Sequence, residues 1–212
     1  MMAQIIGTIT TEGYTCDIHE DSDGRVYFVA DADIDADGAN GQNHALAAYK
    51  QDDSGSELLA NGGMKIQNGK VVCAKEWARQ IVILGEDNEP QVFAGGIIAS
   101  TTWYRYPGKL PNDPSAYVDA ETIPYIVVPP LIIQRTKGIV RGCKAKVSYK
   151  GKSIDCVVAD KGPANKIGEL SIAAARAIGL PSSPRNGGTE KPEVEYEIWP
   201  GIAAPGFELQ RA

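Results

Sequence analysis

Two carboxylates flank a short loop in the segment VVADKGPANKIGEL, residues 157–170. Asp160 ends a run of β-branched residues, and Glu169 precedes an alanine-rich stretch. A chain that turns back through Gly162-Pro163 would bring the two side chains near each other. Such a pair could hydrolyse a glycosidic bond with inversion, because one carboxyl group can protonate the leaving oxygen while the other activates a water. By spacing alone, the pair is more often a turn with a solvated charge.

A second group of carboxylates lies in DADIDADGAN, residues 31–40. An extended chain would put the carboxylates on one face and small or apolar side chains on the other: Asp31, Asp33, Asp35 and Asp37 opposite Ala32, Ile34 and Ala36. Such a face could line a cleft that attracts a cationic polymer. The alternatives are a solvated acidic edge and a calcium loop, but an EF-hand from Asp33 would need Glu where His44 stands.

The chain carries four motifs that resemble known carbohydrate-active proteins. VVADKGPANKIGELSIAAARAIGL, residues 157–180, is similar to the terminal signature of the double-psi β-barrel group, which includes the rare-lipoprotein-A-type lytic transglycosylases. Three stretches also resemble the bacterial branch of glycoside hydrolase family 75, the chitosanases: residues 33–63, 117–129 and 167–180. The similarity spans roughly residues 26–200, although GQNH at 41–44 lengthens the chain after DADGA.

The resemblance implies a function and a site. Family 75 enzymes use one Asp and one Glu, which correspond here to Asp160 and Glu169. The resemblance also implies that other residues contact the substrate: Asp35, Asp37, Tyr49 and Asn61. We therefore expect an endo-acting hydrolase of β-1,4-linked glucosamine chains (chitosan). Glu169 fits the base, because the helix start that follows favours an anion, and Asp160 is then the acid.

Two other functions stay open at this stage. The barrel resemblance also allows cleavage of peptidoglycan glycan strands, by a muramidase or by a lytic transglycosylase with one acid/base carboxylate. The same barrel in expansin-like proteins grips polysaccharide without hydrolysing it. Release of reducing ends distinguishes the enzymes from the binding module.

The aromatic residues of STTWYRYPG, residues 100–108, follow a glycine-rich segment. Their flat rings could stack on sugar faces, and we expect Trp103 and Tyr104 to contact the substrate, although core packing is the more common fate for at least one such ring. Trp77 and Trp199 are predicted to be structural, and Asp119 to fix a loop beside the barrel.

These side chains must be positioned by a mainly β fold. Seven short apolar or alternating runs predict strands: residues 25–34, 80–85, 91–100, 124–129, 143–149, 153–160 and 194–200. A hairpin turn is expected at Lys150-Gly151, which pairs Cys156 with Ala145. We predict one single domain over residues 1–212, a double-psi-like barrel whose signature is concentrated in 120–200, with an N-terminal β-rich extension.

One short helix is predicted over residues 172–178. Ser171 can cap its first turn, and Gly179 followed by Leu180-Pro181 ends it. A weaker helical pattern covers NHALAAYKQ, residues 43–51, and residues 182–193 are expected to form a surface loop.

Composition limits the partners. The chain of 212 residues has 21 Lys and Arg against 27 Asp and Glu, a net charge of −6, which disfavours nucleic acid. No stretch suits a membrane span or a signal peptide, whereas family 75 enzymes are generally exported, so a role outside the cell would need another route. The four cysteines and two histidines form no zinc-ligand spacing, so we expect free thiols, no metal and no cofactor.

Overall fold

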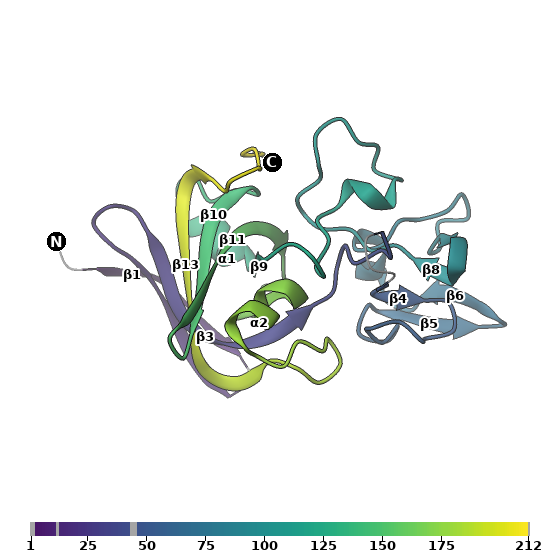
Figure 1. Ribbon diagram of the computed structural model, residues 1–212, viewed down its shortest axis with the longest axis horizontal. Coiled ribbons are helices and arrows are strands. Elements are labelled where there is room, and N and C mark those ends of the chain that lie inside the picture. The colour runs from purple at the N-terminus through teal and green to yellow at the C-terminus, as the bar shows by residue number, and fades with distance from the viewer. Residues whose placement is uncertain (1–2, 12, 43–45, 212) are drawn as a thin grey trace.

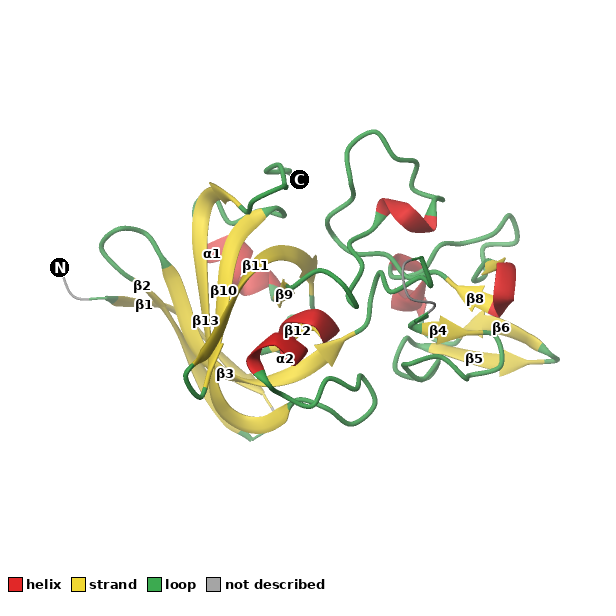
Figure 2. Ribbon diagram, viewed as in Figure 1, coloured by secondary structure: helices red, strands yellow, loops and turns green. Residues whose placement is uncertain are grey.

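The computed structural model describes residues 3–11, 13–42 and 46–211. Most of the regular structure is β (Figures 1 and 2). The strands are β1 (Gln4–Thr11), β2 (Tyr14–Glu20), β3 (Val26–Asp35), β4 (Tyr49–Lys50), β5 (Met64–Gln67), β6 (Lys70–Cys73), β7 (Val92–Phe93), β8 (Ile97–Ile98), β9 (Tyr125–Val128), β10 (Cys143–Tyr149), β11 (Lys152–Lys161), β12 (Glu169–Ser171) and β13 (Thr189–Ala203). The helices are α1 (Pro130–Arg135) and α2 (Ile172–Ile178), with 3-10 turns η1 (Glu76–Gln80), η2 (Ala94–Gly96) and η3 (Pro114–Ala116).

Among the described residues, six strands close a mixed barrel. Their order is β3-β12-β9-β11-β10-β13, and β13 pairs again with β3. The pairs β12–β3 and β11–β9 are parallel, and the other four are antiparallel. The predicted mainly β barrel fold is therefore confirmed.

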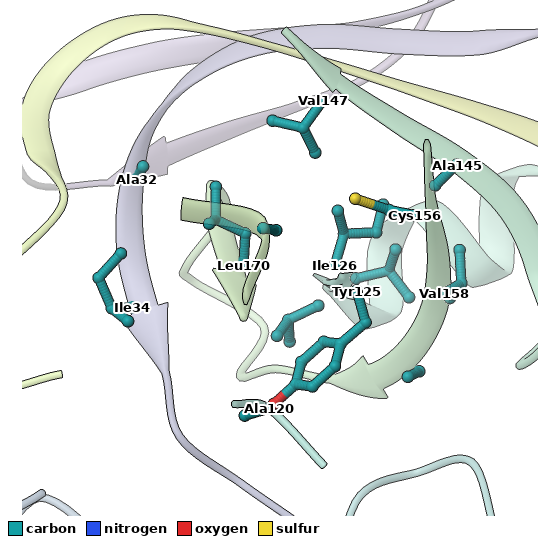
Figure 3. Close-up of a cluster of buried hydrophobic side chains, with 14 of the residues drawn as sticks. Ala32, Ile34, Ala120, Tyr125, Ile126, Ala145, Val147, Cys156, Val158 and Leu170 are labelled. Carbon is teal, nitrogen blue, oxygen red and sulfur yellow. The ribbon is translucent and has the colours of Figure 1, made fainter. Parts of the chain in front are cut away.

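The barrel interior is filled by side chains from alternate positions of its strands. Figure 3 shows this cluster, to which β3, β9, β10, β11 and β12 all contribute. Its labelled members on these strands are Ala32, Ile34, Tyr125, Ile126, Ala145, Val147, Cys156, Val158 and Leu170. Because β3 turns Ala32 and Ile34 inward, the aspartates that alternate with them, Asp31, Asp33 and Asp35, face away from the barrel interior.

Local signals predicted the elements around the barrel correctly. Lys150 and Gly151 form the tight turn of the β10–β11 hairpin, both with positive φ, and Ala145 pairs with Cys156. The Ser171 side chain accepts a hydrogen bond from the Ala174 N–H and caps α2, which ends at Gly179.

Helix α1 was not predicted, so the structure has two short α-helices where the sequence indicated one. Pro130 occupies its first turn, where a missing N–H costs nothing. The apolar run around it has no periodicity long enough to separate strand from helix.

The N-terminal strands form a hairpin outside the barrel. β1 pairs with β2, and β2 continues the sheet from the edge of β3 through His19 and Glu20. The Tyr14 hydroxyl at the start of β2 donates a hydrogen bond of 2.8 Å to Asp31. This hairpin is the β-rich extension that the sequence predicted.

Residues 36–42 and 46–124 lie outside the barrel strands, between β3 and β9. In Figure 1 they form a lobe beside the barrel, with the short strands β4, β5, β6 and β8 at its far side. One hydrophobic cluster runs from the barrel into this lobe, where it includes Tyr49, Met64 and Ile98. The single domain over 1–212 stays a prediction.

The elements predicted from the sequence agree less well with the structure in this lobe. The weak helix at 43–51 is wrong over its described part, because residues 46–48 are irregular and β4 follows. Residues 43–45 lie outside the described structure. The expected strand at 80–85 is reduced to isolated bridges, and the one at 91–100 to the short strands β7 and β8. The expected loop at 182–193 ends at residue 188, because β13 begins at Thr189.

The cysteines are free thiols, as expected, three of them buried and Cys73 half-buried. Among the described residues, no helix has the length and apolar character that crossing a membrane would require.

Candidate active site

Asp160 and Glu169 lie on either side of one strand of the barrel. Asp160 near the end of β11 is in register with Val127 of β9, and Glu169 at the start of β12 is in register with the same residue from the other side. Two strand spacings of about 4.8 Å therefore separate their backbones, roughly 9–10 Å. The sequence prediction that the loop brings these carboxylates together is supported by this register.

The glycine of the intervening turn leaves room for the Glu169 carboxylate. A Cβ at Gly162 would lie 3.3 Å from Glu169 Oε2 and 3.1 Å from a methyl group of Val127. The Gly162 N–H donates to the carbonyl of Val128, which ties the turn to the end of β9. A larger residue at this position would press on the carboxylate.

Two aspartates of the acidic stretch join Asp160. Carboxylate oxygens of Asp35, Asp37 and Asp160 all lie within 4.8 Å of one another. Asp35 ends β3 and is only 8% exposed, so a solvated edge does not describe it. Glu169 is not part of this close group.

Backbone groups hold these carboxylates in place. Asp160 Oδ1 accepts hydrogen bonds from the N–H groups of Trp103 at 2.9 Å and Lys161 at 2.7 Å. Asp35 Oδ1 accepts one from the Asp37 N–H at 2.8 Å. The Tyr125 hydroxyl donates to the Asp37 carbonyl at 2.9 Å. Backbone N–H groups thus fix the carboxylates of Asp35 and Asp160, whereas Asp37 is held through its main chain and its Oδ1 is buried without a hydrogen-bond partner among the described residues.

The carboxylates lie at the wall of a cleft of about 810 Å³. The barrel, the lobe and the loop around residues 184–187 all contribute to it. Its polar and aromatic lining includes Asp33, Asp35, Asp37, Tyr49, Glu57, Asn61, Trp77, Gln80, Asp160, Lys161, Lys166, Glu169, Arg185 and Asn186. The volume lies in the usual range of ligand sites.

Burial and mutual repulsion favour the protonated forms of these groups. Burial raises the pKa of Asp35 to about 6, and the charge of Glu57 adds to this effect. Burial also raises the pKa values of Asp37 and Asp160 well above their ordinary range, with repulsion from Asp35 as the next cause. Burial raises the pKa of Glu169, and the charges of Asp35, Asp160 and Asp33 add to this rise. The positive charge of Lys166 opposes it.

The remaining aspartates of the stretch are paired away from this group. Asp33 forms an ion pair of 2.9 Å with Lys166, and Asp31 accepts the Tyr14 hydroxyl under the N-terminal hairpin. β3 extends through Asp35, so the start of the supposed calcium loop is a strand. The His44 position of that loop lies outside the described residues.

The structure places the predicted substrate residues differently from one another. Tyr49 and Asn61 line the cleft, and the Asn61 amide donates to Glu57 at 2.9 Å. Trp103 reaches the site through its backbone N–H and also lines a second cavity. Tyr104 is 1% exposed and packs edge-on against Tyr106 and Phe207, so its ring meets neither cavity.

Three residues of the cleft were missed by sequence reasoning. Trp77, predicted to be structural, is 47% exposed and lines the cleft. Trp199, also predicted to be structural, is half-buried and lies beneath the Lys144 ammonium. Glu57 is buried and adds a further carboxyl group, and Arg185 donates to the backbone carbonyls of residues 53 and 55. No local motif marks these residues, because only the fold of the lobe brings them to the cleft.

We expect the Tm to fall as pH rises from 5 to 8. Above about pH 4 the carboxyl groups of the unfolded chain have lost their protons, whereas the raised pKa values let the folded state keep them. This difference stabilises the folded state, and it is lost as the pH rises through the pKa values of the folded state, about 6 for Asp35. A pKa that is higher by one in the folded chain than in the unfolded chain corresponds to about 1.4 kcal/mol, so a fall of about 5 °C or more is expected. Asp37→Asn should reduce the slope, which thermal unfolding across this pH range would measure.

The control for this experiment distinguishes stabilisation by bound protons from stabilisation by a bound metal ion, because the same carboxylate oxygens could ligate one. Unfolding is repeated at each pH with millimolar calcium and with a chelator. A Tm raised by calcium and lowered by the chelator, with no fall between pH 5 and 8, would contradict proton sharing.

No protein-family model matches the chain, and no curated protein matches it significantly.

Proposed function

We propose that this protein is an endo-acting glycoside hydrolase that cleaves β-1,4-linked glucosamine chains (chitosan) with inversion. The observation that carries the proposal is the position of Asp160 and Glu169 on either side of Val127. Inverting enzymes keep their two carboxyl groups about 6.5–9.5 Å apart to admit a water, whereas retaining enzymes hold them at about 5–5.5 Å. A backbone separation of roughly two strand spacings favours the wider gap.

The surroundings of the two groups support their roles. Asp160 lies within 4.8 Å of two other carboxylates, and this crowding favours the protonated form that a general acid needs. Glu169 is outside that group; burial raises its pKa as well, but the positive charge of Lys166 opposes this rise. Asp160 is therefore assigned as the acid and Glu169 as the base.

The cleft suits an amino-sugar chain. Carboxyl groups of Asp35, Asp37 and Glu57 face the same space as the catalytic pair, and an ammonium group would stabilise whichever of them is ionised. Trp77 and Tyr49 add rings to the lining, which can stack on sugar faces. Chitosan lies outside cells, so the proposal includes delivery of the protein there.

The finer classification remains part of the proposal. The double-psi group and glycoside hydrolase family 75 rest on the resemblance of a few motifs, above all residues 157–180. The barrel has six strands with both parallel and antiparallel pairs. Among the described residues, this is the only structural feature that supports the double-psi group.

The test is an activity screen on chitosan, chitin and peptidoglycan strands, followed by the stereochemistry of the product. We expect new reducing ends from chitosan, because its ammonium groups match the carboxyl-lined cleft. Proton NMR of freshly cleaved oligosaccharide should show the α-anomer first, since attack by water on the far face of a β-linked sugar inverts it. An initial β-anomer would refute the mechanism, and binding of chitosan without any reducing ends would indicate an expansin-like module instead.

A further inference from the structure

A second cavity of about 630 Å³ lies beside the cleft. Its described lining combines cations and aromatic rings and includes no carboxylate: Gln80, Thr101, Thr102, Trp103, Arg105, Tyr106, Pro107, Gly108, Lys109, Tyr117, Arg141 and Gln210. Three cationic side chains without an acidic neighbour in the lining are unusual in a chain of net charge −6. The electrostatic character of this cavity is therefore opposite to that of the cleft.

The second cavity adjoins the candidate active site. Gln80 lines both spaces. Trp103 lines the second cavity, and its backbone N–H donates to Asp160 at 2.9 Å. A chain molecule that occupies the cleft can thus reach the second cavity within a few sugar units.

Arg141 is held at this boundary but is incompletely hydrogen bonded. Its Nη1 donates to the Trp103 carbonyl at 2.9 Å, and its guanidinium lies 5.6 Å from the centre of the Trp103 ring. Nη2 makes only a long contact of 3.5 Å with the Arg211 carbonyl, and Nε is buried without a partner among the described residues. A guanidinium has five N–H donors, so Arg141 keeps unused donor capacity.

We propose that this cavity binds a sugar unit that carries a carboxylate. Guanidinium groups match the two oxygens of a carboxylate, and such charge-assisted bonds are stronger than neutral ones. Arg105, Lys109 and Arg141 supply the positive charge, while Trp103 and Tyr106 supply rings against which a pyranose face can lie. The binding does not depend on catalysis in the cleft.

The consequence for the substrate, and only that, rests on the proposed function. The cavity adds a chemical requirement to the substrate, a sugar that carries a carboxylate. A glycan that fills both spaces would place an amino sugar over the carboxyl groups and an acidic sugar next to it. Chitosan offers no carboxylate to this cavity, so the proposed substrate extends to glycans in which an acidic sugar stands next to an amino sugar. Peptidoglycan strands, whose N-acetylmuramic acid carries a lactyl carboxylate, are one such glycan, but their N-acetylated sugars bring no ammonium group to the cleft.

The experiment measures binding to the full chain by calorimetry. The probes are the disaccharide of N-acetylglucosamine and N-acetylmuramic acid, a glucuronic-acid disaccharide of the same length, and neutral chitobiose in its acetylated form. We expect both acidic disaccharides to bind at least tenfold more tightly than the neutral one. Preference between the two acidic probes identifies the source of the carboxylate, and equal affinity for all three would overturn the proposal.

Variants locate the site. Arg105→Gln, alone and with Lys109→Gln, should abolish the preference for acidic probes, because both side chains line the cavity. Lys65→Gln, an exposed position on the β5–β6 hairpin, is the matched control and should change nothing. Unfolding curves of each variant exclude misfolding. Lys109 also contacts Ser115, so the double variant loses this contact, whereas the Arg105→Gln single variant keeps it. A preference that survives the double variant would also overturn the proposal, whereas inactivity on every glycan would refute only the proposed function.

Discussion

Replacing Asp160 by Asn is expected to lower kcat on the cleaved glycan at least about a hundredfold, the usual contribution of a general acid. The amide cannot donate the proton that the leaving oxygen needs. The Tm should stay the same or rise, because Asn cannot be ionised in a group of three carboxyl groups whose oxygens lie within 4.8 Å of one another. Initial rates of reducing-end release and thermal unfolding of the same preparation measure both effects.

Matched variants make this result specific. Asp155→Asn is the same substitution on the same strand, at a side chain that is 63% exposed, and it should leave kcat unchanged. Glu169→Gln should reduce kcat to a similar extent as Asp160→Asn, since each removes one half of an acid–base pair. A folded Glu169→Gln variant with normal turnover would refute the assignment of this pair.

Gly38→Ala is expected to lower the Tm by about 10 °C or more, a cost of about 4 kcal/mol. Gly38 has a φ of +78°, and a Cβ there would lie 1.9 Å from the Val118 carbonyl oxygen. Backbone cannot move aside as a flexible side chain can, so either Asp37 or the segment before β9 must shift. Thermal unfolding measures the loss of stability, and activity should fall with the displaced carboxylates.

The control for Gly38 is a glycine with the same backbone but open surroundings. Gly69 has a φ of +75° and no heavy atom within 4 Å of its would-be Cβ. Gly69→Ala should therefore cost only the conformational strain of about 1–2 kcal/mol. Equal losses at the two positions would mean that strain alone, and not the contact with Val118, makes Gly38 necessary.

Features set by neighbouring residues were predictable from the sequence. The Lys150-Gly151 turn and the Ser171 cap each depend on a few adjacent residues, so the hairpin and α2 appear where expected. The same holds for the chain reversal between Asp160 and Glu169. The closure of the barrel by β13 and β3 joins residues more than 150 positions apart, and only the resemblance suggested it.

Features that depend on long-range packing were not predictable. Glu57 and Trp77 enter the cleft because the lobe folds back toward the barrel, and no pattern in their neighbourhood indicates this. Trp103 and Tyr104 are adjacent in an irregular segment and look equivalent in the sequence. The structure separates them, since one borders a cavity and the other fills the contact between Tyr106 and Phe207.

The two ends of the lobe meet on the barrel. It leaves after Asp35 and returns before Tyr125, and the Tyr125 hydroxyl binds the Asp37 carbonyl at 2.9 Å. The strands that carry Asp35, Asp160 and Glu169 are therefore fixed independently of the length of chain between these ends. An engineer can therefore exchange much of the segment between these ends, and with it residues that line the cleft, while the strands of the proposed acid–base pair stay in place; the Trp103 N–H that binds Asp160 must be kept.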